Sequence, residues 1–175
     1  EHLCEVKPDI VYVSITGWGQ FGPNHAAAGY DPLAQAASGF MSVTGSPDGP
    51  PTKAGTYLAD DLGGLHGALG AMAALRHRDQ TGEGQHVDVA LQDALLFQSN
   101  GLPTLGAMGV EPGRMGNEFG FAVPANVYDC QDGPVYVGVL LDAHWAALAE
   151  ILGQPDLADN VAFATRAARV ENRDV

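Results

Sequence analysis

Positive charge is the scarcest property of this 175-residue sequence. Lysine and arginine together number 8, against 21 aspartates and glutamates, which gives a formal net charge of −13 at pH 7. A protein that binds nucleic acid needs a basic face to neutralise phosphates, and this composition offers none. We therefore predict no nucleic-acid partner.

Cysteines and long apolar runs are also scarce. Cys4 and Cys130 stand alone, without a C-x-x-C or histidine-rich context, so we predict no metal site and a reducing, cytoplasmic location. The sequence contains neither a signal peptide nor an apolar run long enough for a membrane helix, so we predict no membrane partner. The first residue is not Met and the last six, "VENRDV", favour a helix without a stop signal. Both ends are therefore expected to be cuts through a longer protein.

Apolar residues make up 46% of the chain and fall in alternating strand-like and helix-like stretches. "PDIVYVSITG" predicts a buried strand that ends at Gly17, and "DPLAQAASGF" predicts a helix that is capped by Asp31 and stops at Gly39. The longest predicted helix begins at Asp60 and ends before the glycines of "TGEG" (81–84). Its apolar residues keep helical spacing: Leu62, Leu65, Leu69, Met72 and Leu75.

The second half of the chain continues this alternation and then changes character. "QHVDVAL" predicts a strand and "LQDALLFQSN" a helix, after which the chain becomes rich in glycine and proline. "ANVYDCQDGPVYVGVLL" then predicts a hairpin around Asp132–Gly133. A helix over "DAHWAALAEILGQ" and a final helix towards residue 175 follow. The order predicts an α/β fold with a domain boundary between residues 110 and 123.

A glycine-rich loop follows the first predicted strand. Residues 17–22, "GWGQFG", match the dinucleotide-binding pattern G-x-G-x-x-G. In that pattern the glycines open a helix directly, yet here Pro23 follows at once, where it would clash inside a helix. No acidic residue ends the next stretch, near residue 40. The sequence predicts a loop at the carboxyl end of a strand, where α/β sheets build their sites, rather than a dinucleotide cradle.

Acidic residues mark the starts of two predicted helices, and their roles are open to two interpretations. Asp60 and Asp61, followed by Gly63 and Gly64, fit a helix cap with a favourable dipole interaction. They also fit a carboxylate nucleophile beside glycines that let a substrate approach the backbone N–H groups. The Tyr30–Asp31 pair is likewise typical of a helix cap. The residues alone leave both interpretations open.

A set of motifs resembles the class III CoA-transferases. The matching stretches are "VYVSITGWGQFGP", "GYDPLAQAASGFMSVTG", "FATRAARVENRD" and, above all, "ADDLGGLHGALGAMAALRHRDQTGEGQHVDVALQDALL". The resemblance implies part of a Rossmann-like large domain followed by the start of a smaller α+β domain. It assigns residues 1–110 to the central part of the large domain, 111–123 to a connector and 124–175 to the small domain. Family members are longer and form interlocked homodimers.

The resemblance also implies a role for Asp60. Counting from it, Gly64, His66 and Gly70 fall where the formyl-CoA transferase pattern has Gly, His and Gly, which selects Asp60 over Asp61. By this resemblance Asp60 attacks an acyl-CoA thioester, forms a mixed anhydride and passes CoA to a carboxylic acid. The helix start is expected to keep the pKa of this nucleophile low.

Supporting residues follow from the same resemblance. They are Tyr30, Asp31, Gly63, Gly64 and Gln20, with Tyr30 also expected to contact CoA. The substrates implied are acyl-CoA and a carboxylic acid, with no metal.

Two alternative functions are kept. The first is a 2-methylacyl-CoA racemase, which needs an acid and a base that titrate near neutral pH. Tyr30 stands where that branch has a histidine, so this residue argues against the racemase. The chain also lacks the glycine run that follows "GN" in formyl-CoA transferase, which argues against specificity for formyl or oxalyl groups. The other alternative is a catalytically silent binding or assembly fragment, because most CoA contacts of the family come from an N-terminal half that is missing here.

Overall fold

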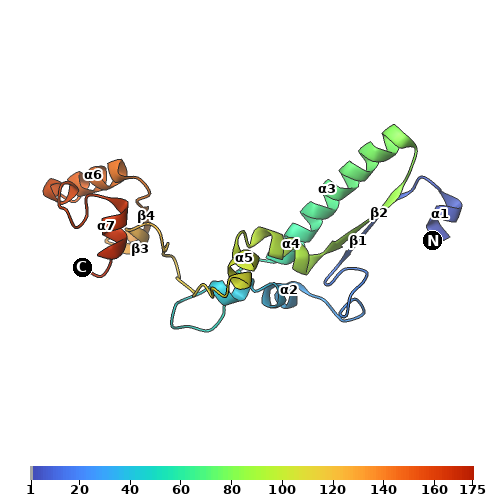
Figure 1. The fold of residues 1–175 in the computed structure, drawn as a ribbon, viewed down its shortest axis with the longest axis horizontal. Coiled ribbons are helices and arrows are strands. Elements are labelled where there is room, and N and C mark those ends of the chain that lie inside the picture. Colours follow the sequence, from blue (N-terminus) through green and yellow to red (C-terminus); the bar gives the residue numbers. More distant parts are fainter. Residues whose placement is uncertain (1) are drawn as a thin grey trace. The chain divides into compact units, whose positions relative to one another are not determined.

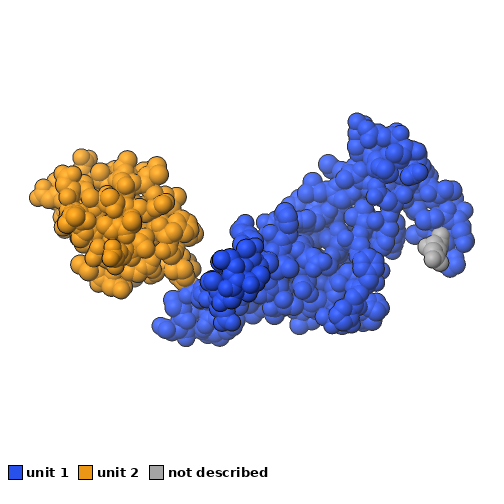
Figure 2. Space-filling model, viewed as in Figure 1, with its two compact units in different colours: residues 1–114 blue, residues 115–175 orange. Residues whose placement is uncertain are grey.

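The computed structural model describes residues 2–175, and the chain separates into two compact units, residues 1–114 and residues 115–175 (Figure 2). Each unit has its own secondary structure and its own buried residues. No helix among residues 2–175 is both long and apolar enough to cross a membrane. Cys4 belongs to the first unit and Cys130 to the second, and both are free and exposed.

Unit 1 is built on a parallel β-α-β arrangement (Figure 1). Strands β1 and β2 pair in register from Val11↔Gln85 to Thr16↔Ala90, and α3 is the long helix between them. The elements are α1 (His2–Val6), β1 (Val11–Thr16), α2 (Asp31–Ala37), the 3₁₀ helix η1 (Phe40–Val43), α3 (Leu58–Thr81), β2 (Gln85–Ala90), α4 (Leu91–Gln98) and α5 (Leu102–Ala107). The mixed α/β character predicted from the sequence is therefore confirmed, whereas α5 lies in a stretch for which no helix was predicted.

Helix α3 packs against the sheet through its smallest residues. Gly63 and Gly67 are buried, and a Cβ added at Gly67 would lie 2.7 Å from the Ile15 Cδ1 atom. At Gly70 the added Cβ would lie 2.6 Å from Val87 Cγ1. The apolar periodicity correctly predicts the helix, but the large side chains point away from this contact: Leu65, Leu69 and Met72 are 53–64% exposed.

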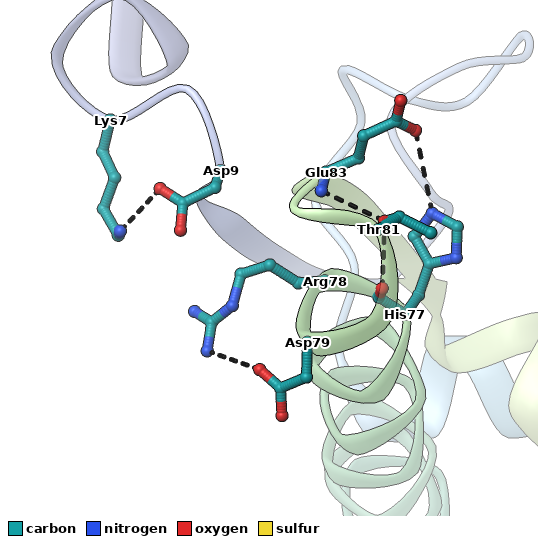
Figure 3. Close-up of polar contacts among 7 residues, drawn as sticks. All are labelled: Lys7, Asp9, His77, Arg78, Asp79, Thr81 and Glu83. Carbon is teal, nitrogen blue, oxygen red and sulfur yellow. Dashed lines mark hydrogen bonds and ion pairs between the residues drawn. The ribbon is translucent and has the colours of Figure 1, made fainter.

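The carboxyl end of α3 is closed by local hydrogen bonds. Gly82 adopts a left-handed conformation (φ 77°), and its N–H donates to the Arg78 carbonyl. The Thr81 hydroxyl donates to the His77 carbonyl over 3.0 Å and accepts the Glu83 N–H over 3.1 Å. Figure 3 shows the two Thr81 hydrogen bonds beside the surface ion pairs Lys7–Asp9 and Arg78–Asp79. The predicted stop of the helix at the "TGEG" glycines is confirmed.

The best-buried apolar cluster of unit 1 lies at the amino end of α3. Ala34 of α2, Ala59 of α3, and Leu91 and Leu95 of α4 are all at most 7% exposed. Partly buried side chains pack around them: Phe40, Leu58 and Leu62. This cluster fixes α2 and α4 against the first turn of α3, which is the segment that carries the Asp60–Asp61 pair.

Unit 2 begins with a hairpin and ends with short helices. Its elements are β3 (Ala125–Cys130), β4 (Gly133–Gly138), α6 (Asp142–Ile151), the 3₁₀ helix η2 (Pro155–Ala158) and α7 (Arg166–Glu171). The antiparallel register ends at Cys130↔Gly133, so the loop consists of Gln131 and Asp132. The hairpin is confirmed, with its loop one residue earlier than predicted.

Arg169 of α7 is the central polar residue of unit 2 and is only 2% exposed. Its guanidinium donates to the Val123 carbonyl (2.8 Å), the Phe163 carbonyl (2.8 Å) and the Asp142 carboxylate (3.0 Å). It also lies 5.5 Å from the centre of the Trp145 ring. One side chain therefore ties together the segment before β3, the start of α6 and the segment before α7.

Candidate active site

The carboxyl ends of β1 and β2 bring several loops of unit 1 together. The Gly17 carbonyl accepts the Gln92 N–H over 3.2 Å, which connects the end of β1 to the start of α4. Gly17 also packs backbone-to-backbone against Gly29, where neither residue has room for a Cβ. The carboxyl edge of a parallel sheet is the usual place for a ligand in α/β proteins. These loops therefore form the candidate site.

The glycine-rich loop is anchored to the sheet rather than to a helix. The Gly19 N–H donates to the Thr16 hydroxyl over 2.9 Å, and the Gln20 N–H donates to Asp88 Oδ2 over 2.8 Å. Helix α2 begins only at Asp31, so the G-x-G-x-x-G glycines do not open a helix. The physical requirement of a dinucleotide cradle is absent, as the position of Pro23 predicts.

Asp31 does not cap its own helix. The residue before α2 is Tyr30, and Asp31 is the first helical residue. Its Oδ1 atom instead accepts the N–H of Ala59, the second residue of α3, over 2.7 Å. This carboxylate is 2% exposed. The sequence prediction of a local cap was therefore wrong, because the unpaired N–H group that Asp31 satisfies belongs to a helix 28 residues away in the chain.

Asp60 is the third residue of α3 and is exposed. Within the part of the chain that the structure describes, its carboxylate forms no hydrogen bond or ion pair, whereas the neighbouring Asp61 carboxylate accepts the Thr56 hydroxyl over 3.4 Å. Asp60 thus presents a free carboxylate beside a helix start whose backbone is already capped by Asp31. Such an arrangement leaves both oxygens available to a substrate.

The electrostatics of Asp60 differ from the sequence expectation. Its pKa is raised above the ordinary aspartate value, first by desolvation and then by the negative charges of Asp31 and Asp61. A helix start alone would lower this pKa. Desolvation, together with the charges of these two neighbouring aspartates, therefore outweighs the dipole, and the expectation of a low pKa was wrong.

The other residues predicted for the site fall into two groups. Gly63 is buried, and a Cβ there would overlap Leu91 Cδ2, so this glycine has a packing role. Gly64 is exposed, with open space where a Cβ would be, and Tyr30 is 68% exposed directly before α2. Gln20 extends from the anchored glycine loop and is exposed.

Sequence reasoning missed two polar residues that shape this region. Gln35 of α2 is fully buried and contacts both Asp31 and the backbone before α3. Asp88 of β2 holds the Gln20 N–H through one oxygen, and its other oxygen is buried without a partner among residues 2–175. A lone glutamine in a helix and an aspartate in an alternating strand carry no local motif. The four-residue spacing from Asp31 to Gln35 is the single signal in the sequence.

Metal ligands do not gather in this region. Among residues 2–175, no group of three or more His, Cys, Asp or Glu side chains has the geometry to hold a metal ion.

Comparison with known proteins gives a consistent result. A family model described as CoA-transferase family III matches residues 1–175. The chain is 41% identical to succinate–glutarate CoA-transferase of Agrobacterium fabrum and 38% identical to acetyl-CoA:oxalate CoA-transferase of Acetobacter aceti. Both alignments cover 99% of this chain but only 44% and 45% of the relative.

Solved structures agree with the sequence matches. The fold superposes on a CAIB/BAIF family protein from Brucella suis with a TM-score of 0.84 and 38% identity, over 98% of this chain and 46% of that one. A protein of Mycobacterium tuberculosis matches with a TM-score of 0.80 and 26% identity. The chain thus spans less than half the length of the proteins it matches, and by the match along all 175 residues it belongs to the CoA-transferase family III.

Proposed function

We propose that this chain is the nucleophile-bearing part of an enzyme that moves CoA from an acyl-CoA donor to a carboxylic acid acceptor, with Asp60 as the nucleophile. The observation that carries the proposal is the free, exposed carboxylate of Asp60 in the first turn of α3, at the carboxyl edge of a parallel sheet. Membership of the family supports the reaction type. The raised pKa of Asp60 supports it too, because a more basic carboxylate is a better nucleophile.

The proposed reaction needs no proton transfer. A carboxylate oxygen of Asp60 attacks the thioester carbon, and the C–S bond breaks. CoA leaves as a thiolate, and the acyl group remains on Asp60 as a mixed anhydride. The thiolate attacks the aspartyl carbonyl, which releases the donor acid and leaves CoA on Asp60 as a thioester. An acceptor carboxylate takes the CoA by the reverse of these two steps, which restores Asp60. Covalent catalysis of this kind divides one difficult transfer into easier ones.

The surrounding residues have proposed supporting roles. Tyr30 is exposed next to Asp31 and is proposed to contact CoA, and Gln20 is proposed to donate a hydrogen bond to the substrate from the glycine loop. Gly64 leaves open space beside the nucleophile. The relatives named above act on the dicarboxylates oxalate, succinate and glutarate, so short dicarboxylic acids are the first acceptors to test.

The chain is proposed to be the central part of a longer enzyme. In this proposal residues 1–110 belong to the large domain, 111–123 connect it to the small domain, and 124–175 begin the small domain. The exposed face of α3 at Leu65, Leu69 and Met72 supports the idea, because a folded domain normally covers such an apolar stripe. The complete enzyme is proposed to be a cytoplasmic homodimer.

Trapping the covalent intermediate tests the function. The complete enzyme is incubated with succinyl-CoA, the adduct is captured with hydroxylamine or borohydride, and the modified peptide is identified by mass spectrometry. The modification is expected on Asp60. Asp60→Asn is expected to lower kcat by roughly 10³-fold or more, as is typical when a covalent nucleophile is removed.

Asp61→Asn is the matched control, since it removes an equal charge from the neighbouring residue. It is expected to keep the adduct and most of the activity. Modification at any other residue, or equal loss in both variants, would show that Asp60 is not the nucleophile. Deuterium exchange at the α-carbon of a 2-methylacyl-CoA without an acceptor acid would point to the racemase instead.

A second candidate is a silent binding or assembly fragment. The observation that favours it is the two-stranded parallel sheet of unit 1, which is smaller than the sheets that usually form a complete α/β site. A calorimetric titration of the 175-residue chain with CoA separates the two candidates. Heat of binding together with an adduct on Asp60 would support a working site in this chain, whereas no heat together with no adduct would support the silent fragment.

A further inference from the structure

Gln35 connects α2 to the segment that precedes α3. Its side-chain Oε1 accepts the Ala54 N–H over 2.8 Å, while its Nε2 donates to Asp31 Oδ2 over 2.6 Å and approaches the Thr56 carbonyl at 3.5 Å. The residue is 0% exposed. Every polar atom of this buried amide therefore has a partner, as buried polar groups require.

The chain of bonds continues to the proposed nucleophile. Asp31 receives Gln35 on one oxygen and the Ala59 N–H, over 2.7 Å, on the other. Ala59 is 0% exposed and directly precedes Asp60. The backbone position of Asp60 thus depends on the carboxylate of Asp31, and the orientation of that carboxylate depends on the amide of Gln35.

The amide group is specific for this place. A methionine would fill a similar volume, but it would leave the Ala54 N–H and one oxygen of Asp31 without partners inside the protein. A glutamate would place a second carboxylate against Asp31 at hydrogen-bond distance, which repels unless one of them is protonated. Only a side chain with both a donor and an acceptor satisfies both neighbours.

We propose that Gln35 is a positioning residue for the CoA-transfer reaction: it orients Asp31, which caps α3 and holds the backbone before Asp60 in its reactive place. This inference rests on the proposed function and adds a residue to it. Gln35 touches neither substrate nor Asp60, so its effect passes through Asp31 and Ala59. Its loss is expected to slow the covalent step more than it weakens substrate binding.

The swap of donor and acceptor is the decisive experiment. In Asp31→Asn, the amide N–H groups of residues 31 and 35 face each other, so their hydrogen bond is lost. In Gln35→Glu, the carboxylates of residues 31 and 35 face each other and repel. In the double variant Asp31→Asn/Gln35→Glu, the amide at position 31 can donate to the new carboxylate and still accept the Ala59 N–H, while the carboxylate accepts the Ala54 N–H. The three short hydrogen bonds of the wild type therefore return, although the negative charge has moved along α2.

The readouts are kcat, KM and the rate of adduct formation on Asp60 with succinyl-CoA in the complete enzyme. Each single variant and Gln35→Met are expected to lower kcat about 10- to 100-fold with KM within about 3-fold of the wild type. The double variant is expected to recover at least about 5-fold over the single variants. Leu33→Ala, at a half-exposed position on the same helix, serves as the control for general damage to α2.

The outcomes separate this inference from the function on which it rests. A wild-type enzyme without an adduct overturns the proposed function and the positioning role with it. A wild-type adduct with unchanged rates in Gln35→Met overturns only the positioning role. The positioning role is also overturned if the double variant is no more active than the single variants. It is overturned too if only KM rises and kcat is unchanged, because a merely structural residue gives those results.

Discussion

The two units each contain a buried polar side chain that joins separate segments, but the charge is balanced in only one of them. In unit 2, the buried Arg169 guanidinium meets a carboxylate and two carbonyl oxygens and lies near an aromatic ring. In unit 1, the buried carboxylate of Asp31 meets two N–H donors. Among residues 2–175, no Lys or Arg side chain forms an ion pair with Asp31.

This difference separates a structural junction from a candidate reactive site. A compensated charge such as Arg169 stabilises the segments that it joins. At Asp60, desolvation and then the like charges of Asp31 and Asp61 raise the pKa, so the ionised form of this side chain opposes folding. Uncompensated charge of this kind is typical of functional sites, where stability is traded for reactivity.

The largest effect is expected where the compensated junction is broken. Arg169→Met would leave two backbone carbonyls without their donor and empty part of the space beside Trp145. We expect unit 2 to lose about 2–4 kcal/mol of unfolding free energy. Urea unfolding followed by Trp145 fluorescence, in a background with Trp18→Phe, measures it.

The control for Arg169→Met is Arg166→Met, because Arg166 lies on the same helix and is exposed. Its effect is expected to stay within about 0.5 kcal/mol. Equal losses in the two variants would mean that the charge of α7, and not the junction, stabilises unit 2.

An intermediate effect is expected where the glycines of α3 pack against the sheet. This contact joins separate elements of unit 1, as Arg169 joins separate segments of unit 2. Gly70→Ala places a methyl group against the β-branched Val87 side chain, which has little freedom to move. We expect a loss of about 1–2 kcal/mol in unfolding free energy. Gly64→Ala meets open space and is expected to gain about 0.5–1 kcal/mol from helix propensity. Thermal unfolding that ranks the two variants in the opposite order would contradict this packing.

The smallest effect concerns the acidic cluster itself. The pKa of Asp60 is raised in the folded state, so the ionised folded protein is penalised and the penalty vanishes when Asp60 is protonated. Asp60→Asn is therefore expected to be more stable than the wild type at pH 7, by no more than about 0.5 kcal/mol because the group is exposed and screened. The difference should disappear below about pH 4, where aspartate is protonated in the unfolded chain as well. Urea unfolding at the two pH values tests it, and a destabilised variant at pH 7 would reverse the sign.

Elements with strong local signals could be predicted from the sequence. The apolar run "VYVSIT" correctly predicted β1, but the expectation that this strand is buried was wrong, because only Ser14 is buried in it. The glycines after Thr81 predicted the end of α3, and the Asp132–Gly133 turn signal predicted the pairing of β3 with β4. Helix α5 was missed because Pro103 and Gly106 lie in a stretch whose composition indicates a loop. Proline is tolerated there because it falls in the first turn of the helix.

Features that depend on tertiary contact could not be predicted. The spacing of leucines in α3 indicates a helix, but it does not reveal that Gly63, Gly67 and Gly70 face the sheet. The sequence does not distinguish an aspartate that caps its own helix from one that caps another helix, so Asp31 was assigned to the wrong helix. The role of Gln35 could not be predicted, because it depends on the Ala54 N–H, which only the folded backbone brings beside this side chain. The role of Asp60 itself stays a prediction.

The two free cysteines provide a built-in tool for following movement. Cys4 lies in α1 of unit 1 and Cys130 at the end of β3 in unit 2, and both thiols are exposed. A donor and an acceptor dye attached to these native thiols would report the separation of the two units by energy transfer, without any change of sequence. Addition of succinyl-CoA to the labelled protein then gives a direct optical record of whether substrate alters that separation.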